Sequence, residues 1–290
     1  MNESAHHIYA ARVDAVIAQR DRLRGGSRAG DRWAGSAVES FRGDPHRPLD
    51  PNLEILASYV QPDDVLVDIG GGAGRISLPL SLRCRQVVNV DPSDGMAAAF
   101  GDSATQAGIT NARVVSGEWP DVTGVSGDIA VVANVTYFVR EIVPFVRHLQ
   151  ETIARRVMVT VWTTPPPSRN APLFRLVYDE EEAPVPGHRE LLAVLWELDI
   201  MPDLLVLPGA RSGDRRSPTR EAAIEDAVRS LAREQWAFGP LPAPWEAKAR
   251  DILDTRFNDL FEQTADGFRQ RWPKPASEVL VTWETHPGGR

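Results

Sequence analysis

Cysteine and long apolar segments are nearly absent from this chain of 290 residues. The single cysteine, Cys84, excludes an intrachain disulfide, a cysteine-rich zinc site and an iron–sulfur cluster held by three cysteines. No apolar run reaches the roughly 18–20 residues that a membrane-spanning helix needs. Residues 1–26 carry charges throughout and lack the apolar segment of a signal peptide. We therefore expect a cytoplasmic protein with no membrane partner.

Basic residues are also in deficit. The chain has 40 acidic and 32 basic residues, and its formal net charge is −8. Because a basic face supplies most of the affinity of a general nucleic-acid-binding protein, nucleic acid is not the expected partner. One local basic stretch, at Arg211, Arg215, Arg216 and Arg220, is typical of a solvated loop; a contact for an anionic group is the alternative. The sequence has no HExxH motif and no other histidine spacing typical of metal ligands, so no metal site is predicted.

Short segments rich in valine and isoleucine alternate with helical stretches in the first half of the chain. The predicted strands are residues 65–69, 86–90, 112–116, 128–135 and 155–162. The predicted helices between them are residues 74–82, 94–106 and 141–152. This alternation, with strands that are apolar on both faces, favours an α/β fold whose parallel sheet is covered by helices on both sides.

The segments on either side of this region differ from it. An amphipathic helix is predicted over residues 5–24, and residues 25–50 are loop-like, with a possible short helix at 34–41. A further helix begins at Pro51, with Asp50 as its N-cap. The prolines of residues 163–170 exclude a helix or a central strand there.

The second half of the chain continues with a helix, a strand, two more helices and a last strand. The predicted bounds are 188–199, 203–208, 217–233, 243–268 and 277–284, with Ser217 capping the third element and Pro218 opening it. We therefore predict three parts. Residues 1–50 are an N-terminal helical cap, residues 51–208 and 277–290 form the sheet domain, and residues 209–276 are a helical insertion that makes a substrate roof or a dimer face.

The most informative stretch is the glycine-rich turn after the first predicted strand. Asp68, Gly70, Gly72 and Gly74 follow an Asp-x-Gly-x-Gly-x-Gly spacing. Glycine is needed where the backbone takes a positive φ or approaches a ligand closely. The dinucleotide fingerprint G-x-G-x-x-G fits in no register, because counting from Gly70 its third glycine falls on Arg75.

This spacing resembles the first motif of the class I S-adenosylmethionine-dependent methyltransferases. The resemblance covers residues 50–162 well, and the terminal strand fits the family's antiparallel seventh strand. It implies a Rossmann-like, doubly wound, mostly parallel sheet of seven strands in the order 3-2-1-4-5-7-6. It also implies that the backbone of Gly70, Gly72 and Gly74 approaches the methionine moiety of the cofactor, and that Asp68 helps to bind its amino-acid end.

Further cofactor-binding residues follow the next strands. Asp91 ends the second predicted strand, where an acid can accept two hydrogen bonds from ribose hydroxyls; alone it would also fit NAD. The resemblance implies that Pro92 and Met96 supply the apolar contact to the adenine. It likewise implies that Glu118 lies near the exocyclic amine of the adenine. Trp119 is a candidate to flank the ring, and a surface loop with a buried Trp119 is the alternative.

The fourth strand should end beside the reactive methyl group, since ligands sit at the carboxyl ends of parallel strands. Asn134 and Tyr137 are therefore candidates to face the methyl group or the acceptor, with Tyr137 as the candidate catalytic residue. Trp33, Phe41 and Arg42 are candidates for substrate binding. The Asn/Asp-Pro-Pro-Tyr/Phe box of many methyltransferases that act on base nitrogens is absent here, which lowers the expectation of a nucleic-acid target.

The sequence thus predicts a methyltransferase that transfers a methyl group from S-adenosyl-L-methionine to O, N or C of a small-molecule metabolite, with S-adenosyl-L-homocysteine as product. A methyltransferase acting on RNA or protein is one alternative. A non-catalytic nucleoside-binding protein on the same fold is another, because fold alone does not fix function. Both a monomer and a homodimer remain open.

Overall fold

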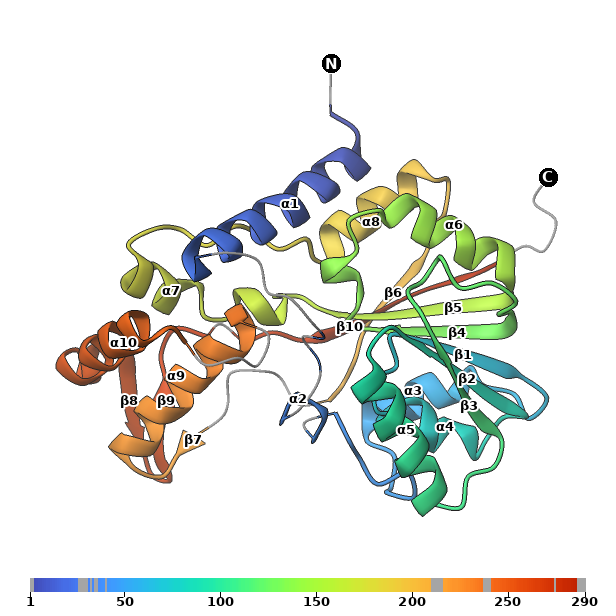
Figure 1. The fold of residues 1–290 in the computed structure, drawn as a ribbon, viewed down its shortest axis with the longest axis horizontal. Helices are drawn as coiled ribbons and strands as arrows, with labels where there is room; N and C mark the ends of the chain where they lie inside the picture. Colours follow the sequence, from blue (N-terminus) through green and yellow to red (C-terminus); the bar gives the residue numbers. More distant parts are fainter. Residues whose placement is uncertain are drawn as a thin grey trace.

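A computed structural model describes residues 3–25, 31, 33, 36–39, 41–209, 216–236, 241–273 and 275–285. Its centre is a seven-stranded sheet in the order β3-β2-β1-β4-β5-β10-β6 (Figure 1). The strands are β1 (Val65–Ile69), β2 (Gln86–Asp91), β3 (Ala112–Ser116), β4 (Gly127–Ala133), β5 (Ile153–Trp162), β6 (Asp203–Val206) and β10 (Glu278–Glu284). β10 runs antiparallel to both β5 and β6, and the other strands are parallel. The predicted fold class, strand order and antiparallel last strand are confirmed.

Helices cover both faces of this sheet, as the strand pattern predicts. One face carries α1 (Ala5–Arg24), α6 (Ile142–Thr152) and α8 (His188–Glu197), and the other carries α3 (Pro51–Ser58), α4 (Ser77–Ser81) and α5 (Asp94–Gln106) (Figure 1). Successive strand residues serve opposite faces: Val67 packs in the core under α1 and α6, whereas Leu66 packs in the core under α3 and α5. Asp50 caps α3 as predicted, since its carboxylate accepts hydrogen bonds from the first turn of that helix.

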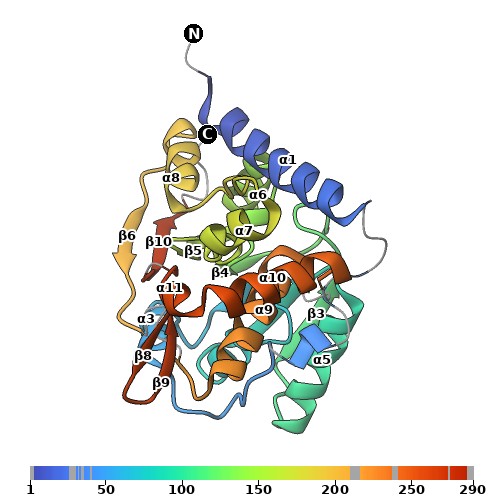
Figure 2. The ribbon, with the colours of Figure 1, turned by 90° about the vertical axis from the view of Figure 1, so that its left-hand side faces the viewer.

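The parts outside the sheet reach its carboxyl edge. β6 ends at Val206 and the antiparallel β10 begins at Glu278, so the chain between them leaves and returns at that edge. The described elements there are β7 (Arg216–Ser217), α9 (Arg220–Trp236), α10 (Ala243–Thr255), α11 (Phe257–Leu260), β8 (Phe261–Thr264) and β9 (Gly267–Gln270). Figure 2 views the molecule from this side, with α9, α10 and the β8–β9 hairpin toward the reader.

The insertion has its own core and its own small sheet, of order β7-β9-β8. The predicted helix over 243–268 is wrong beyond Leu260: it is divided at Arg256 into α10 and the short α11, and the residues that follow form β8 and β9. The spacing of Phe257, Phe261 and Phe268 matches a helix, but Ala265 and Asp266 form a two-residue turn between β8 and β9, and Gly267, which opens β9, has a φ of 124°. Helix α7 (Ala171–Tyr178), which the sequence did not predict, packs in this core rather than on the sheet.

The start of α9 also differs from the prediction. Ser217 lies in β7, and its hydroxyl donates a hydrogen bond to Asp226 instead of capping the helix. The helix begins at Arg220, and Thr219 takes the capping role, because its hydroxyl oxygen accepts from the backbone N–H of Ala222. The remaining short elements are α2 (Ser36–Glu39), η1 (Thr136–Phe138) and η2 (Pro166–Ser168).

None of the helices in the described ranges has both the length and the apolar character needed to cross a bilayer. The N-terminal helix α1 instead joins the core of the sheet domain. Its Tyr9 is fully buried and donates a hydrogen bond of 2.5 Å to the backbone carbonyl of Thr136 in η1. The first helix of the chain is therefore tied to the loop that follows β4.

Candidate functional site

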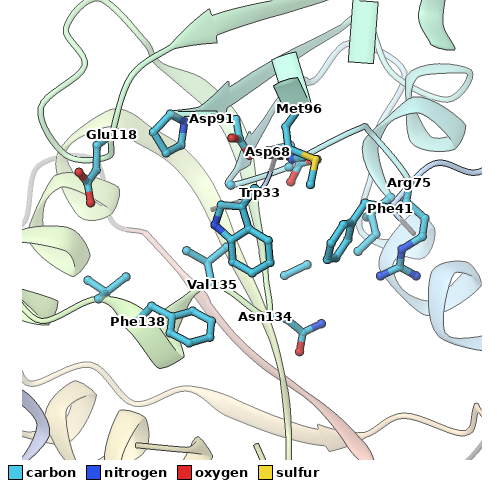
Figure 3. Close-up of a pocket in the computed structure, with 17 residues that line it drawn as sticks. Trp33, Phe41, Asp68, Arg75, Asp91, Met96, Glu118, Asn134, Val135 and Phe138 are labelled. Carbon is cyan, nitrogen blue, oxygen red and sulfur yellow. Dashed lines mark hydrogen bonds between the residues drawn. The ribbon is translucent and has the colours of Figure 1, made fainter. Parts of the chain in front are cut away.

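A pocket of about 240 Å³ opens at the carboxyl ends of β1, β2 and β4 (Figure 3). The sheet order reverses between β1 and β4, and ligands of doubly wound folds bind at such a switch point. Its lining residues are Trp33, Phe41, Asp68, Gly70, Gly71, Gly72, Arg75, Ile76, Asp91, Pro92, Met96, Glu118, Ala133, Asn134, Val135, Phe138 and Val139. The sequence pattern thus brings the loops after four strands, β1, β2, β3 and β4, to one cavity.

The glycine turn lines the pocket because its backbone takes conformations that side chains oppose. Gly70 and Gly72 have φ angles of 65° and 56°, and a Cβ on Gly70 would lie 2.5 Å from Val135. Gly74 also has a positive φ, but it faces Leu78 and does not line the pocket. Gly74 therefore serves helix packing, whereas Gly70 and Gly72 serve the cavity.

Gly71 is a position that the motif spacing missed. Its φ is ordinary, but an added Cβ would lie 2.2 Å from Asp68 Oδ2 and 2.7 Å from Asn89 Oδ1. The neighbouring strands bring these two side chains together, since Asp68 of β1 pairs in register with Asn89 of β2. Only glycine fits against them, so this residue is required by close approach rather than by its backbone angle.

Asp68 is the least satisfied polar group of the site. It is 1% exposed, and neither carboxylate oxygen has a hydrogen-bond partner. Burial raises the pKa of Asp68 to about 7, against a smaller opposing effect from Ser77 and the positive charge of Arg75. The adjacent Asn89 Oδ1 also has no partner. Buried acceptors of this kind are costly unless a donor or a cation meets them, so this end of the pocket fits an ammonium group.

Asp91 is held rigidly at the end of β2. Its two carboxylate oxygens accept hydrogen bonds of 2.9 Å from the backbone N–H groups of Gly72 and Ser93. Burial raises its pKa, and the two backbone donors oppose that rise. Each oxygen keeps a further lone pair, so the carboxylate can still accept from a pair of vicinal hydroxyls. Ser93 in turn donates to Asp31 over 2.6 Å, which anchors the N-terminal segment above β2.

The adenosine side of the candidate site holds most of the residues that the sequence predicted. Pro92, Met96 and Glu118 all line the pocket, and Met96 is 3% exposed with its sulfur facing Gly72. Trp119 does not line it. Its indole N–H donates to the Phe145 carbonyl, and the ring is buried in the sheet core. The predicted contact of Trp119 with the adenine is therefore contradicted by its placement.

Trp33 and Phe41, two aromatic residues of the N-terminal segment, form part of the wall of the pocket. The rings of Trp33 and Phe41 meet edge to face at 5.8 Å, and Trp33 also meets Phe138 at 6.3 Å. Arg42, predicted beside them, does not line the cavity. Its guanidinium contacts Glu39, Asp102 and α5 instead, so it fastens the segment to the protein surface.

Asn134 faces the pocket in a strained conformation. Its φ is 62°, a value uncommon outside glycine, and its backbone N–H donates to the Thr160 carbonyl. The Tyr137 hydroxyl donates to Asn134 Oδ1 over 3.2 Å and accepts from the backbone N–H of Trp162 over 2.6 Å. Asn134 Nδ2 donates a 3.4 Å hydrogen bond to Glu278. The amide is thus held at its oxygen by Tyr137 and at its nitrogen by Glu278, and these two bonds fix its orientation.

Tyr137 itself does not line the pocket, which corrects its placement as the candidate catalytic residue. It is 3% exposed, and burial raises the pKa of its hydroxyl further above the ordinary value. A neutral hydroxyl that already accepts from a backbone N–H is a poor proton acceptor. Tyr137 can therefore act only through Asn134, as a positioning residue.

The arginine-rich stretch of the insertion is only partly within the described residues, because Arg211 and Arg215 lie outside them. Arg220 pairs with Asp254 at 2.8 Å and packs over the ring of Phe257. Across the described ranges, no cluster of three His, Cys, Asp or Glu side chains is placed to hold a metal ion.

Residues 67–156 match the sequence profile of a family described as a methyltransferase domain. This chain contains an S-adenosylmethionine-dependent methyltransferase domain. The predicted family, enzyme class and cofactor are thereby confirmed. A search of curated protein sequences gives no match to the chain.

Two solved structures resemble the methyltransferase domain and its additions in fold. The YcgJ protein of Bacillus subtilis is 16% identical, with a TM-score of 0.54 over 82% of this chain and 99% of that chain. A candidate methyltransferase from Bacillus halodurans C-125 is 11% identical, with a TM-score of 0.53 over 87% of this chain and 100% of that chain. At these identities the likeness establishes the fold alone.

Several lining residues of the methyltransferase domain were missed at the level of sequence, namely Gly71, Arg75, Ile76, Ala133, Val135, Phe138 and Val139. All lie within five residues of a predicted site residue. Arg75 and Ile76 follow the last glycine of the motif, and Ala133 to Val139 surround Asn134. Reading each motif together with the loop that continues it would have found them, because the loops at strand ends line such sites.

Proposed function

We propose that the methyltransferase domain transfers the methyl group of S-adenosylmethionine to an oxygen, nitrogen or carbon atom of a small-molecule metabolite. The observation that carries the proposal is the buried, unpartnered carboxylate of Asp68 in a pocket that also holds Asp91 and the glycine turn. The carboxylate of Asp68 is buried without a partner, and the carboxylate of Asp91 is held in place by two backbone N–H groups. A pocket with these two acids fits a ligand that has both an ammonium group and a ribose.

The residues present fit this cofactor. Asp68 would receive the ammonium group, and the backbone of Gly70 and Gly72 would adjoin the methionine moiety. Asp91 would accept from the ribose hydroxyls. Pro92 and Met96 would pack on the adenine, with Glu118 at its exocyclic amine.

When bound, S-adenosylmethionine supplies a methyl group that is already activated on a sulfonium sulfur. The chain's own task is alignment and the exclusion of water, and orientation alone can lower a barrier by about 7–11 kcal/mol. Trp33 and Phe41 would close the pocket over the reacting groups. Asn134 would orient the acceptor by hydrogen bonding, since an amide does not remove a proton at neutral pH.

The wall on the acceptor side supports a small and largely apolar acceptor. Trp33, Phe41 and Phe138 supply aromatic surface, and Asn134 supplies the polar group among them. Small-molecule sites commonly combine an apolar wall with a few placed polar groups. The insertion 209–276 and the segment that carries Trp33 and Phe41 would form the roof of this site, because the insertion leaves and returns at the carboxyl edge of the sheet and both aromatic residues line the pocket.

Isothermal titration with S-adenosylhomocysteine is the first test, followed by a turnover assay that measures its formation from S-adenosylmethionine. The acceptor panel would contain small phenols, amines and enols, with total RNA and a protein extract as separate arms. Binding together with turnover on a small molecule is expected. Absence of binding of either nucleoside would overturn the proposal, turnover only on RNA or protein would overturn the acceptor class, and binding without any turnover would favour a non-catalytic role.

A further inference from the structure

One edge of the large sheet, β6, is both open and apolar. β6 ends the strand order beyond β10, and within the described ranges no strand pairs with its outer side (Figure 2). All four residues of β6 are exposed, and three of them are Leu204, Leu205 and Val206. Its only charged residue is Asp203, so the lysines that commonly protect such an edge are missing. An exposed apolar edge strand is a template for pairing with another strand.

The apolar surface extends from β6 to the segment before it. Across the parts of the chain that the structure describes, eight large apolar side chains are exposed, and five of them lie within residues 196–206. These five are between 40% and 74% exposed, and they are Trp196, Met201, Leu204, Leu205 and Val206. They present on the order of 500 Å² in each chain, so two copies joined there would bury about 1,000 Å², which is the area that a specific interface needs.

The backbone of β6 determines which strand can pair with this edge. The backbone N–H of Leu207 donates to the Glu278 carbonyl at the start of β10 over 2.9 Å. Successive residues of a strand turn their N–H and C=O groups to alternate sides. The backbone groups of Leu205 therefore face β10 as well, whereas those of Leu204 and Val206 face outward, away from the sheet.

A second copy of β6 that runs antiparallel pairs with all of these outward groups in only one register. When Leu205 lies opposite its own counterpart, each Leu204 lies opposite the other copy's Val206, and the two pairs exchange four N–H···O bonds. A slip by one residue sets outward groups against groups that already face β10. A slip by two residues brings Pro202 or Pro208 opposite an outward group, and proline has no N–H to donate.

We propose that β6 pairs with β6 of a second copy of this chain, about a two-fold axis at Leu205. The pairing joins the two seven-stranded sheets into one continuous sheet, with α8 of both copies on the same face. Leu204 and Val206 lie on that face, because Val281 and Val279, which pair with them in β10, belong to the core under α8. A two-fold contact uses this edge in both copies, so the assembly ends at a dimer.

Charge favours the antiparallel arrangement over a parallel one. Each chain has a formal net charge of −8, so two copies associate only where the contact itself is free of like charges. In the antiparallel register the two Asp203 side chains lie at opposite ends of the paired segment, each opposite a Leu207. A parallel pair in register would place the two Asp203 side chains next to each other, and like charges directly opposite are destabilising.

Sedimentation equilibrium of the full chain tests this pairing without cofactor or acceptor. The natural chain should have the mass of two copies within the range from about 1 to about 100 µM. Leu205→Lys places two ammonium groups together at the two-fold axis and should raise the dissociation constant of the dimer at least about a hundredfold. Leu82→Lys is the matched control, because Leu82 is a similarly exposed leucine outside residues 196–206, and its dimer should equal that of the natural chain.

Two further measurements test the register and the backbone bonds. An equimolar mixture of Leu205→Lys and Leu205→Glu should form a dimer again, because the two-fold axis brings the opposite charges together. Val206→Pro removes an outward N–H that the pairing with β10 does not use, and proline is tolerated at such edge positions. It should weaken the dimer about tenfold, since two hydrogen bonds are lost, and leave the far-UV circular dichroism of the chain unchanged.

A natural chain that is monomeric throughout this range would overturn the proposal. A dimer that persists in Leu205→Lys, or one that Leu82→Lys dissociates equally, would show that β6 is not the interface. Failure of the mixture to associate would overturn the register at Leu205. None of these measurements involves S-adenosylmethionine, so their outcome is independent of the proposed function.

Discussion

Replacing Asp68 with asparagine should stabilise the protein without ligand and weaken its binding of the cofactor. The carboxyl is 1% exposed and has no partner, and burial raises its pKa from 3.8 to about 7. One pKa unit corresponds to 1.36 kcal/mol, so a shift of roughly three units costs the ionised folded state about 4 kcal/mol. Asparagine keeps the size of the side chain and removes the charge, and its amide can donate to the unpartnered Asn89 Oδ1.

The direction of the pH dependence follows from the raised pKa of Asp68. Between about pH 4 and pH 7 the folded chain holds a proton on this carboxyl that the unfolded chain has lost. Stability from this group therefore falls as the pH rises through that range, and the full penalty is present above pH 7. The gain from Asp68→Asn should be small at pH 4 and about 4 kcal/mol at pH 7.5. At about 2 °C per kcal/mol, Tm at pH 7.5 should rise by about 8 °C.

Urea and thermal unfolding at pH 4.5 and 7.5, each with and without S-adenosylhomocysteine, would measure these effects. Asp64→Asn is the matched control, since Asp64 is also buried beside β1 but is paired with Arg155 at 2.5 Å. That variant should be destabilised by about 1–3 kcal/mol at both pH values. Asp68→Asn should also bind S-adenosylhomocysteine at least tenfold more weakly. An Asp68→Asn protein that melts lower than the natural chain at pH 7.5 would refute the view that this carboxylate is an unsatisfied ligand-binding group.

Three further substitutions distinguish residues that bind the ligand from residues that hold the pocket in shape. Asp91→Ala should weaken S-adenosylhomocysteine at least tenfold in calorimetry, because the ribose hydroxyls lose their acceptor; unchanged affinity would show that the ribose lies elsewhere. Gly71→Ala should lower Tm and abolish binding, since its Cβ would meet Asp68 Oδ2 at 2.2 Å; a variant that binds normally would contradict the close approach. Tyr137→Phe should lower the free energy of unfolding in urea by about 1–3 kcal/mol, because the Trp162 N–H loses its buried partner. Its affinity for S-adenosylhomocysteine should stay within about twofold; a large loss of this affinity with normal stability would show that Tyr137 contacts the ligand directly.

Local patterns predicted the parts of the fold that local physics decides. The apolar strands, the Asp50 cap and the glycine turn are each set by residues next to one another, and all were found from sequence. The sequence also located Asp68 and Asp91, because the carboxyl ends of neighbouring parallel strands lie at the same edge of a sheet. The lining residues at strand ends were predictable for the same reason.

Residues whose places depend on distant packing could not be assigned in this way. Trp119 follows β3 as an adenine contact would, but its ring turns inward to reach the Phe145 carbonyl of α6. Gly71 is required by Asn89 on the neighbouring strand, which no spacing within the motif reveals. The aromatic spacing from Phe257 to Phe268 fits a helix equally well, but the chain is helical only to Leu260, and the turn at Ala265 and Asp266 joins β8 and β9 into a hairpin.

The pocket is divided between the matched span 67–156 and segments outside it, and this division bears on specificity. The candidate cofactor contacts lie at the ends of β1 and β2, within the matched span 67–156, whereas Trp33 and Phe41 come from the segment before it. Glu278, which orients the Asn134 amide, comes from the strand after the insertion. Changes outside residues 67–156 can therefore alter the acceptor side of the pocket without touching Asp68 or Asp91. Because Asn134 and Phe138 of the same wall lie inside that span, we expect the choice of acceptor to depend on both parts, and variants of Trp33 and Glu278 would test the part outside residues 67–156.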